Sequence, residues 1–294
     1  MTTILALIGS ARPWGNCEVL AREALAGARD AGADTLALLR LTDLRVEPCT
    51  GCLVCALRGQ ACPISDDVAF LLEQVRQADA FLIAAPVYFV GPVAQAKRVL
   101  DRMLMWASSP DWATVSPKLA ITLTAAGLEP WRGVAQALYN ALAMSLGGRL
   151  LGWMTAYATG PGEVLLQPDA LAAARDLGRR LVTAEDAPRR EFACPTCGSD
   201  AFRIHGDRVV CPICGQEGRL MAQDSAPRIR FDDSPRSERW SPSGFYRHIQ
   251  EWIVPSGERF LARRREIKAL RARYEGLGET WIRPPSRADD ADTR

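Results

Sequence analysis

Short apolar runs alternate with amphipathic stretches along the first part of the chain. The apolar runs predict five buried parallel strands, at residues 4–8, 34–41, 80–86, 118–127 and 149–158. The intervening stretches predict helices at 17–31, from Asp66 and Asp67 onward, at 93–106, 131–146 and 168–183. Because a helix follows each strand, residues 1–185 are expected to form an α/β domain with a doubly wound, five-stranded parallel sheet.

The pattern changes after residue 185. A polar linker over 185–191 leads to a cysteine-rich segment at 191–222, and a Ser-, Pro-, Asp- and Arg-rich stretch at 224–244 is expected to be a flexible connection. A helical extension is predicted over 245–282, with the helix at 245–277 interrupted near Pro255. The apolar residues of that helix form a narrow stripe: Phe260, Ile267, Leu270, Tyr274 and Leu277. The tail from Arg283 is expected to be disordered.

Composition and charge narrow the class of protein. The 294 residues are 48% hydrophobic and 24% charged, which is ordinary for a soluble globular chain. A net charge of +2 argues against a nucleic-acid or membrane partner for the whole chain. The first residues lack a basic region and read as a strand, and no apolar stretch is long enough for a bilayer, so a cytoplasmic location is expected. In that reducing compartment, closely spaced cysteines indicate metal or redox chemistry.

The loop from Gly9 to Cys17 joins the first strand to the first helix. Backbone N–H groups and a helix N-terminus converge there, so the loop can receive a phosphate, although the same composition also suits an ordinary βα turn. It has neither the G-K-[ST] of a Walker loop nor G-x-G-x-x-G. A second loop with two aromatic residues, 86–92, follows the third strand. In an open α/β sheet these two loops meet at the switch point where a mononucleotide binds.

Taken together, these loops resemble the NADPH-dependent FMN reductase family of the flavodoxin-like superfamily. The resemblance covers residues 1–185, and its motifs are Gly9-Ser10-x-Arg12 with Gly15-Asn16, Pro86-Val87-Tyr88-Phe89, and Lys97 with Asp101-Arg102. It implies strand order 2-1-3-4-5, bound FMN and oxidoreductase activity. It places the FMN phosphate at Ser10, Arg12, Asn16 and Cys17, and the ring against Pro86, Val87, Tyr88 and Phe89. The turn Thr124-Ala125-Ala126-Gly127 would touch the far edge of the ring.

Cys17 departs from the pattern of the family, which usually has Thr or Ser at this position. A thiol is a poorer hydrogen-bond donor than a hydroxyl. Cys17 therefore also fits the role of a small buried residue at a helix start.

The first cysteine set has the spacing C-x2-C-x2-C-x6-C and consists of Cys49, Cys52, Cys55 and Cys62. Three cysteines two residues apart can wrap around an iron–sulfur cluster while the fourth returns from further along, and Gly51 and Gly59 free the backbone. This set narrows the resemblance to the iron–sulfur flavoproteins, which implies a [4Fe–4S] cluster near FMN across a dimer interface. Reduced thiols or bound zinc remain as alternatives for the loop at 49–62.

The second set has the spacing C-x2-C-x13-C-x2-C and consists of Cys194, Cys197, Cys211 and Cys214. Two C-P-x-C-G knuckles flank a predicted hairpin at 202–210 that turns at Gly206-Asp207, which is the pattern of a structural zinc ribbon. Rubredoxin-like iron uses the same ligands and stays open as an alternative. Four thiolates complete a tetrahedron, so no position is left for catalysis, and His205 is expected to cap the hairpin.

These observations predict an FMN-dependent oxidoreductase that passes electrons between a [4Fe–4S] cluster and FMN. No catalytic residue beyond the flavin is assigned. One alternative is an NAD(P)H-dependent FMN or quinone reductase without a cluster. Another is a non-catalytic protein that binds nucleic acid or protein through the ribbon and the basic C-terminal helix with Arg263, Arg264 and Arg265. Expected partners are NAD(P)H, a small-molecule or ferredoxin-like electron donor or acceptor, and copies of the chain in a homodimer or tetramer.

Overall fold

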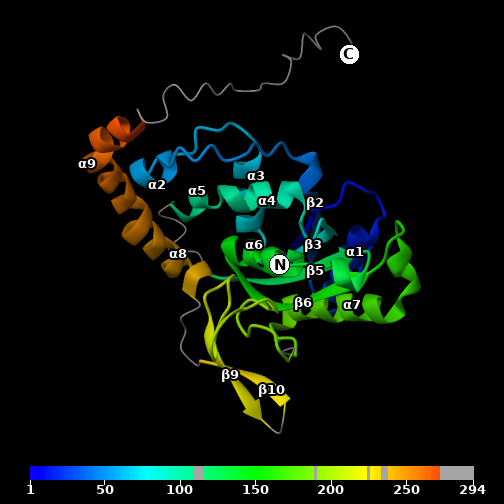
Figure 1. Cartoon of the computed structure of the whole chain (residues 1–294). Helices are drawn as coiled ribbons and strands as arrows, with labels where there is room; N and C mark the ends of the chain where they lie inside the picture. Colours follow the sequence, from blue (N-terminus) through cyan, green and yellow to red (C-terminus); the bar gives the residue numbers. More distant parts are fainter. Residues whose placement is uncertain (109–115, 189–190, 224–225, 233–237, 272–294) are drawn as a thin grey trace.

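A five-stranded parallel sheet lies at the centre of the molecule (Figure 1). The computed structural model describes residues 1–108, 116–188, 191–223, 226–232 and 238–271. The strands are β1 (Thr3–Ile8), β2 (Thr35–Arg40), β3 (Ala80–Tyr88), β5 (Lys118–Ala126) and β6 (Gly148–Tyr157). Their order β2-β1-β3-β5-β6 confirms the predicted fold class. A two-residue strand, β4 (Gly91–Pro92), pairs antiparallel with the end of β3.

Helices cover both faces of this sheet. On one face lie α1 (Asn16–Asp30) and α7 (Pro168–Thr183), and on the other lie α3 (Val68–Gln77), α4 (Ala94–Arg102) and α6 (Ala135–Ser145). The helices α1 and α7 approach closely because of glycine. A Cβ at Gly178 would lie 1.7 Å from the carbonyl oxygen of Ala24. No helix in the described ranges is long and apolar enough to cross a membrane.

Several shorter elements were not resolved by the hydrophobic pattern. The predicted helix at 93–106 is divided into α4 and α5 (Leu104–Ala107), and the helix predicted from 131 begins only at α6, after η3 (Glu129–Trp131). Two further turns are η1 (Leu41–Asp43) and η4 (Glu163–Leu166). A one-turn helix, α2 (Val54–Arg58), lies inside the first cysteine loop. Left-handed residues at Leu53 and Gly59, with φ of 57° and 59°, bound it on both sides.

The second cysteine set belongs to a separate antiparallel sheet of order β10-β9-β8-β7. Its strands are β7 (Arg203–His205), β8 (Arg208–Val210), β9 (Glu217–Gln223) and β10 (Ala226–Phe231). His205 pairs with Arg208 across the predicted turn, and Gly206 there has φ of +63°. The expectation of a flexible connection over 224–244 is wrong where β10 lies, because pairing with β9 orders that segment.

The small sheet of β7 to β10 and its cysteines are called the ribbon below. The C-terminal elements form a strut along one edge of the molecule, from the ribbon toward α2 (Figure 1). After η5 (Glu238–Trp240), the strut consists of α8 (Pro242–His248), the π-helical turn η6 (Ile249–Ile253) and α9 (Val254–Arg271). Pro255 falls in the first turn of α9, where proline is tolerated, and the irregular turn precedes it. In the predicted apolar stripe Phe260 and Leu270 are exposed, while Tyr274, Leu277 and the tail lie outside the described residues.

Candidate functional site

A cavity of about 260 Å³ opens at the carboxyl ends of β1, β3 and β5. This is the edge of an open α/β sheet where ligands bind. The predicted FMN-site residues that line it are Ser10, Arg12, Asn16, Cys17, Pro86, Val87, Tyr88, Ala125 and Gly127. The loop after β6 adds Ala158, Thr159 and Pro161, which the sequence pattern did not single out.

Phe89, Thr124 and the buried Ala126 are the predicted residues that do not line the cavity. Phe89 sits at the tip of the turn after β3, is 96% exposed and has φ of 46°. Thr124 is fully buried, and its hydroxyl has no hydrogen-bond partner in the described part of the chain. It lies two residues from Thr122, which bonds to α6, so its side chain shares the face of the sheet that α6 covers.

A buried carboxylate organises the phosphate loop. Glu18 has a side chain only 5% exposed, and it accepts hydrogen bonds from Arg40 at 2.8 Å and from the backbone N–H of Trp14 at 3.0 Å. Arg40 also donates to the carbonyl oxygen of Ser10 at 2.6 Å. Burial acts to raise the pKa of Glu18, but hydrogen bonds from Arg40, Arg22 and Trp14 together hold this pKa below its ordinary value. The loop is therefore held in shape by an ion pair within the protein.

The start of α1 presents backbone rather than side-chain donors. The side chain of Asn16 is already engaged within the protein. Its Nδ2 donates to the carbonyl oxygens of Ala158 and Gly160, at 3.2 and 3.0 Å, and its Oδ1 accepts from the backbone N–H of Val164. Asn16 thus ties the loop after β6 to the helix. No side chain caps α1, so its N-terminal N–H groups remain oriented for an anion. Burial raises the pKa of Cys17 to about 12, so Cys17 stays a neutral thiol.

Tyr139 fixes the turn that flanks the cavity. Its hydroxyl donates to the carbonyl oxygen of Pro86 at 2.7 Å and accepts from the backbone N–H of Val93 at 2.9 Å. The side chain is 1% exposed, and burial raises the pKa of Tyr139, so the hydroxyl remains protonated. Tyr139 lies on α6, distant in sequence from the turn it holds. An apolar-looking helix position contains no signal of this role.

The first cysteine loop is closed at its two ends by a buried ion pair. Arg102 donates to Asp66 at 2.6 Å and to the carbonyl oxygen of Glu47 at 3.0 Å, and Asp66 accepts from the N–H of Glu47 at 2.9 Å. Arg102 also donates to the sulfur of Cys62 at 3.3 Å. The side chains of Arg102 and Asp66 are each 1% exposed.

The four thiols of this loop are partly open to solvent. Cys49 and Cys52 are exposed, while Cys55 and Cys62 are half-buried. Burial, followed by repulsion from Cys62 and Cys52, raises the pKa of Cys55. Among the described residues, the four cysteines of this loop do not form a group of metal-binding atoms within 4.8 Å of one another, as those of the second set do. A cluster carries its own sulfides between its ligands, so a set of four cysteines can hold one without their sulfurs being in contact.

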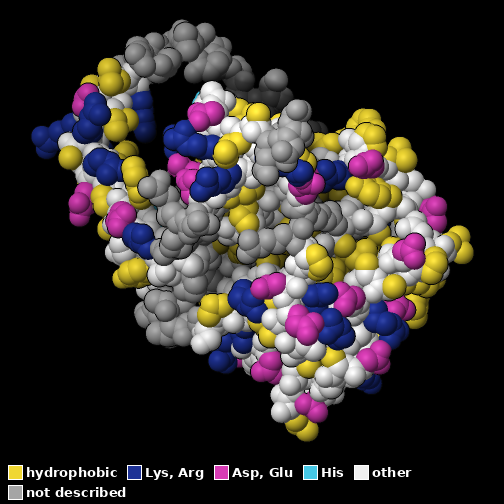
Figure 2. Space-filling view, turned by 90° about the horizontal axis from the view of Figure 1, so that it is seen from below, with side chains coloured by type: hydrophobic (Ala, Val, Ile, Leu, Met, Phe, Trp, Pro, Cys, Tyr) yellow, Lys and Arg dark blue, Asp and Glu magenta, His cyan; other side chains and the backbone are white. Residues whose placement is uncertain are grey.

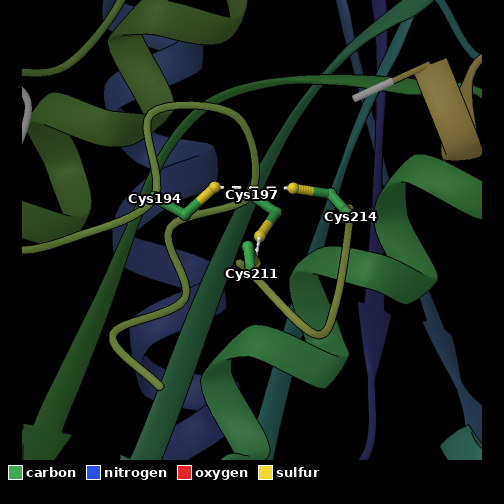
Figure 3. A group of neighbouring side chains, drawn as sticks. All are labelled: Cys194, Cys197, Cys211 and Cys214. Carbon is green, nitrogen blue, oxygen red and sulfur yellow. Dashed lines mark hydrogen bonds between the residues drawn. The ribbon is translucent and has the colours of Figure 1, made fainter. Parts of the chain in front are cut away.

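The second cysteine set forms a compact, buried metal-sized site (Figure 3). All four cysteines are 0% exposed, and their sulfurs lie within 4.8 Å of one another. The backbone N–H of Gly198 donates to the carbonyl of Cys194 at 2.9 Å, and that of Gly215 donates to Cys211 at 2.9 Å. Hydrogen bonding with Cys194, more than burial, raises the pKa of Cys197, so the crowded thiols do not all ionise without a cation. The donor set fits one tetrahedral ion.

A chain of buried amides attaches this metal site to the flavodoxin-like domain. Asn140 donates to the carbonyl oxygen of Cys197 at 2.7 Å, and Gln136 donates to Asn140 at 2.9 Å and to Thr122 at 2.6 Å. Gly198 lies against Trp153, whose ring leaves no room for a Cβ. The ribbon is therefore docked on α6 and the sheet through specific contacts.

Comparisons with known proteins agree with this arrangement. The family model described as NADPH-dependent FMN reductase matches residues 2–155. An iron–sulfur flavoprotein of Methanocaldococcus jannaschii is 40% identical over 99 residues, which are 34% of this chain and 50% of that relative. A flavone synthase of Aspergillus candidus is 26% identical over 93% of this chain and 95% of its own length. A solved flavone reductase, 19% identical, superposes with a TM-score of 0.76 over 96% of this chain and all of its own.

The family match covers β1 through most of β6, and with it the first cysteine loop and the part of the cavity that the loops after β1, β3 and β5 line. The cavity residues after β6, from Ala158 to Pro161, lie beyond the match. The solved structure shares the fold of this chain over nearly its whole length. This chain matches only half the length of the iron–sulfur flavoprotein. We conclude that this chain is a flavin-dependent oxidoreductase that belongs to the NADPH-dependent FMN reductase family.

Proposed function

We propose that FMN binds in the cavity at the carboxyl edge of the sheet and exchanges electrons with a [4Fe–4S] cluster held by Cys49, Cys52, Cys55 and Cys62. The observation that supports this most is the position of the cysteine loop, which follows β2 at the same edge of the sheet as the cavity. The similarity to iron–sulfur flavoproteins supports the cluster. FMN supplies hydride or single-electron chemistry, and the cluster supplies single electrons.

The residues of this chain have separable tasks in this proposal. Ser10, Arg12 and the open N-terminus of α1 bind the phosphate, because they line the cavity and offer donors. Tyr139 holds the segment from Pro86 to Val93, which orients the isoalloxazine ring. The side chain of Asn16 holds the loop after β6, which also lines the cavity, in place.

Anaerobic purification followed by iron, sulfide and flavin analysis tests this function. We expect FMN together with about four iron and four sulfide per chain at the first set. A Cys52→Ser variant is expected to lose that iron and sulfide while keeping FMN. Iron-free protein with FMN bound would defeat the electron exchange and leave an NAD(P)H-dependent FMN or quinone reductase without a cluster.

A second function, reduction of a planar aromatic substrate, is favoured by the rim of the cavity. Tyr88, which lines the cavity, is 53% exposed, and Phe89 beside it is 96% exposed. Trp14, on the phosphate loop, is 63% exposed. Aromatic faces of this kind stack on flat conjugated ligands. The similarity to a flavone synthase over nearly the whole chain supports a substrate of flavone-like size. NADPH oxidation that stays unchanged when flavones are added would contradict it.

For the second cysteine set we propose a zinc ion with a structural role. The ribbon is too small to hold a core of its own, and its buried centre consists largely of the four cysteines. Rubredoxin-like iron is distinguished by its colour and by metal analysis. On the face shown in Figure 2, basic and acidic side chains are interspersed rather than gathered, which disfavours a nucleic-acid interface there.

We further propose NAD(P)H or a small ferredoxin-like protein as electron partner, and a homodimer or tetramer as the assembly. The exposed thiols of Cys49 and Cys52 support a partner that approaches the first loop from solvent. Stopped-flow reduction by NADPH and by reduced ferredoxin, together with light scattering, tests both points.

A further inference from the structure

The ion pair of Arg102 and Asp66 is among the most buried polar groups of the chain. Both side chains are 1% exposed, although a buried charge is costly unless it is paired and fully hydrogen-bonded. The pair makes further hydrogen bonds with the backbone at the start of the first cysteine loop. Arg102 donates to the carbonyl oxygen of Glu47, and Asp66 accepts from the N–H of Glu47. The pair therefore acts as a clamp that brings residue 47, just before Cys49, next to residues 62–66.

The clamp also reaches one of the four thiols directly. The Nη2 of Arg102 lies 3.3 Å from the sulfur of Cys62 and donates to it. A cysteine binds metal as the thiolate, and a guanidinium N–H aimed at the sulfur stabilises that negative charge. Cys62 follows a six-residue gap and is the ligand that the chain must bring back from furthest away.

The helix that carries Arg102 connects the two redox positions. The helix α4 starts at Ala94 and ends at Arg102. The residue before it, Val93, belongs to the turn beside the cavity, and its N–H donates to the hydroxyl of Tyr139. Nine helical residues span about 14 Å. One rigid element thus joins the turn beside the cavity to the clamp beside the cysteine loop.

We propose that Arg102 is the positioning residue of the cluster, which holds Cys62 as a ligand and raises the reduction potential of the cluster. This inference rests on the proposed function. Each electron that a cluster accepts adds a negative charge, and hydrogen bonds to its sulfurs favour the more negative state. The donor from Arg102 therefore stabilises the reduced cluster more than the oxidised cluster.

The test uses the full chain, purified anaerobically with FMN. The double variant Arg102→Met with Asp66→Asn removes the hydrogen-bond donor to Cys62 without leaving a buried unpaired charge. The single variant Arg102→Lys keeps the positive charge but lacks the planar guanidinium group with its several N–H donors. Iron and sulfide are measured per chain. The midpoint potential is measured by titration with dithionite as electron donor and ferricyanide as oxidant, and followed by electron paramagnetic resonance of the reduced cluster.

We expect the double variant to shift the one-electron equilibrium at least tenfold toward the oxidised cluster, a midpoint lower by about 59 mV. Arg102→Lys is expected to shift it in the same direction by less. Arg98 provides the matched control, because it extends from the same helix to the carbonyl oxygen of Val46 and makes no contact with a cysteine in the described structure. Arg98→Met should keep both the iron content and the potential.

The outcomes separate this inference from the function on which it rests. A double variant that keeps FMN but loses iron, while Arg98→Met keeps it, supports the positioning role. A double variant with the iron content and the midpoint of the wild type overturns the inference and leaves the proposed function standing. A wild-type chain that holds no iron after anaerobic purification overturns the proposed function itself.

Discussion

Replacement of Tyr139 by phenylalanine tests how the turn beside the cavity is held. The change removes one oxygen, which is the partner of the buried N–H of Val93 and of the half-buried carbonyl of Pro86. An unsatisfied buried group costs about 1–3 kcal/mol, and the half-buried carbonyl of Pro86 costs about 1 kcal/mol because water can reach it, while the packing of the ring is kept. We therefore expect the free energy of unfolding to fall by about 2–4 kcal/mol.

The same change is expected to weaken FMN binding. If about 1.4 kcal/mol of the binding energy is used to reorder the turn from Pro86 to Val93, the dissociation constant rises tenfold. Urea unfolding by circular dichroism and quenching of FMN fluorescence measure the two effects. Because burial raises the pKa of Tyr139, the hydroxyl keeps its proton at neutral pH, and the loss should be the same at about pH 6 and about pH 8.

Tyr246 is the matched control for this experiment. It lies on α8, and it is 44% exposed. Tyr246→Phe should change the free energy of unfolding by less than about 0.5 kcal/mol and leave FMN affinity unchanged. A Tyr139→Phe protein whose unfolding and FMN affinity both match the wild type would refute the idea that this hydroxyl holds the turn.

Three further changes, one of them with a matched control, probe the phosphate loop and the ribbon. Hydrogen bonds depress the folded-state pKa of Glu18, so its contribution is present above the unfolded pKa of about 4.3 and is lost as pH falls through the folded value. Glu18→Gln should therefore lose less stability than wild type in acid unfolding between about pH 5 and pH 3, and parallel curves would contradict this. Cys197→Ser should remove the ribbon ion, measured by elemental mass spectrometry, and a retained ion would contradict the tetrahedral site. Gly198→Ala places a Cβ 2.2 Å from the ring of Trp153 and should cost about 3 kcal/mol or more in urea unfolding. Gly206→Ala, with a similar φ of +63° and no atom within 4 Å, should cost only about 1–2 kcal/mol, and equal losses would contradict the close packing.

The sheet and the loops that bear the cavity could be predicted from sequence because their signals are local. A run such as residues 80–86 is apolar and short, and the small and hydroxyl residues of the phosphate loop follow directly on a strand. The predicted order of strands is found in the structure, and most of the residues predicted to bind FMN line the cavity, while the contribution of the loop after β6 was not predicted. The sequence signal of the second cysteine set was equally local, since each pair of cysteines lies on one turn.

The parts that could not be predicted depend on contacts between distant residues. Tyr139 bonds to Val93 across 46 positions, Arg102 to Asp66 across 36, and Asn140 to Cys197 across 57. Tyr139, Arg102 and Asn140 sit on helices, and the sequence of a helix does not show which distant backbone or side-chain group such a residue will meet. The strand β10 was missed for the same reason, because its order comes from pairing with β9 rather than from a hydrophobic run of its own.

The strut has a consequence for the order in which the molecule is assembled during synthesis. Its elements contact α2 of the first cysteine loop, and Gly257 lies so close to Leu57 that an added Cβ would be 3.1 Å from that side chain. Ribosomes deliver the chain from its N-terminus, so the cysteine loop emerges long before the strut that covers it. The α2 side of the loop is therefore uncovered until the strut has been synthesised and docks, whereas Cys49 and Cys52 stay exposed afterwards.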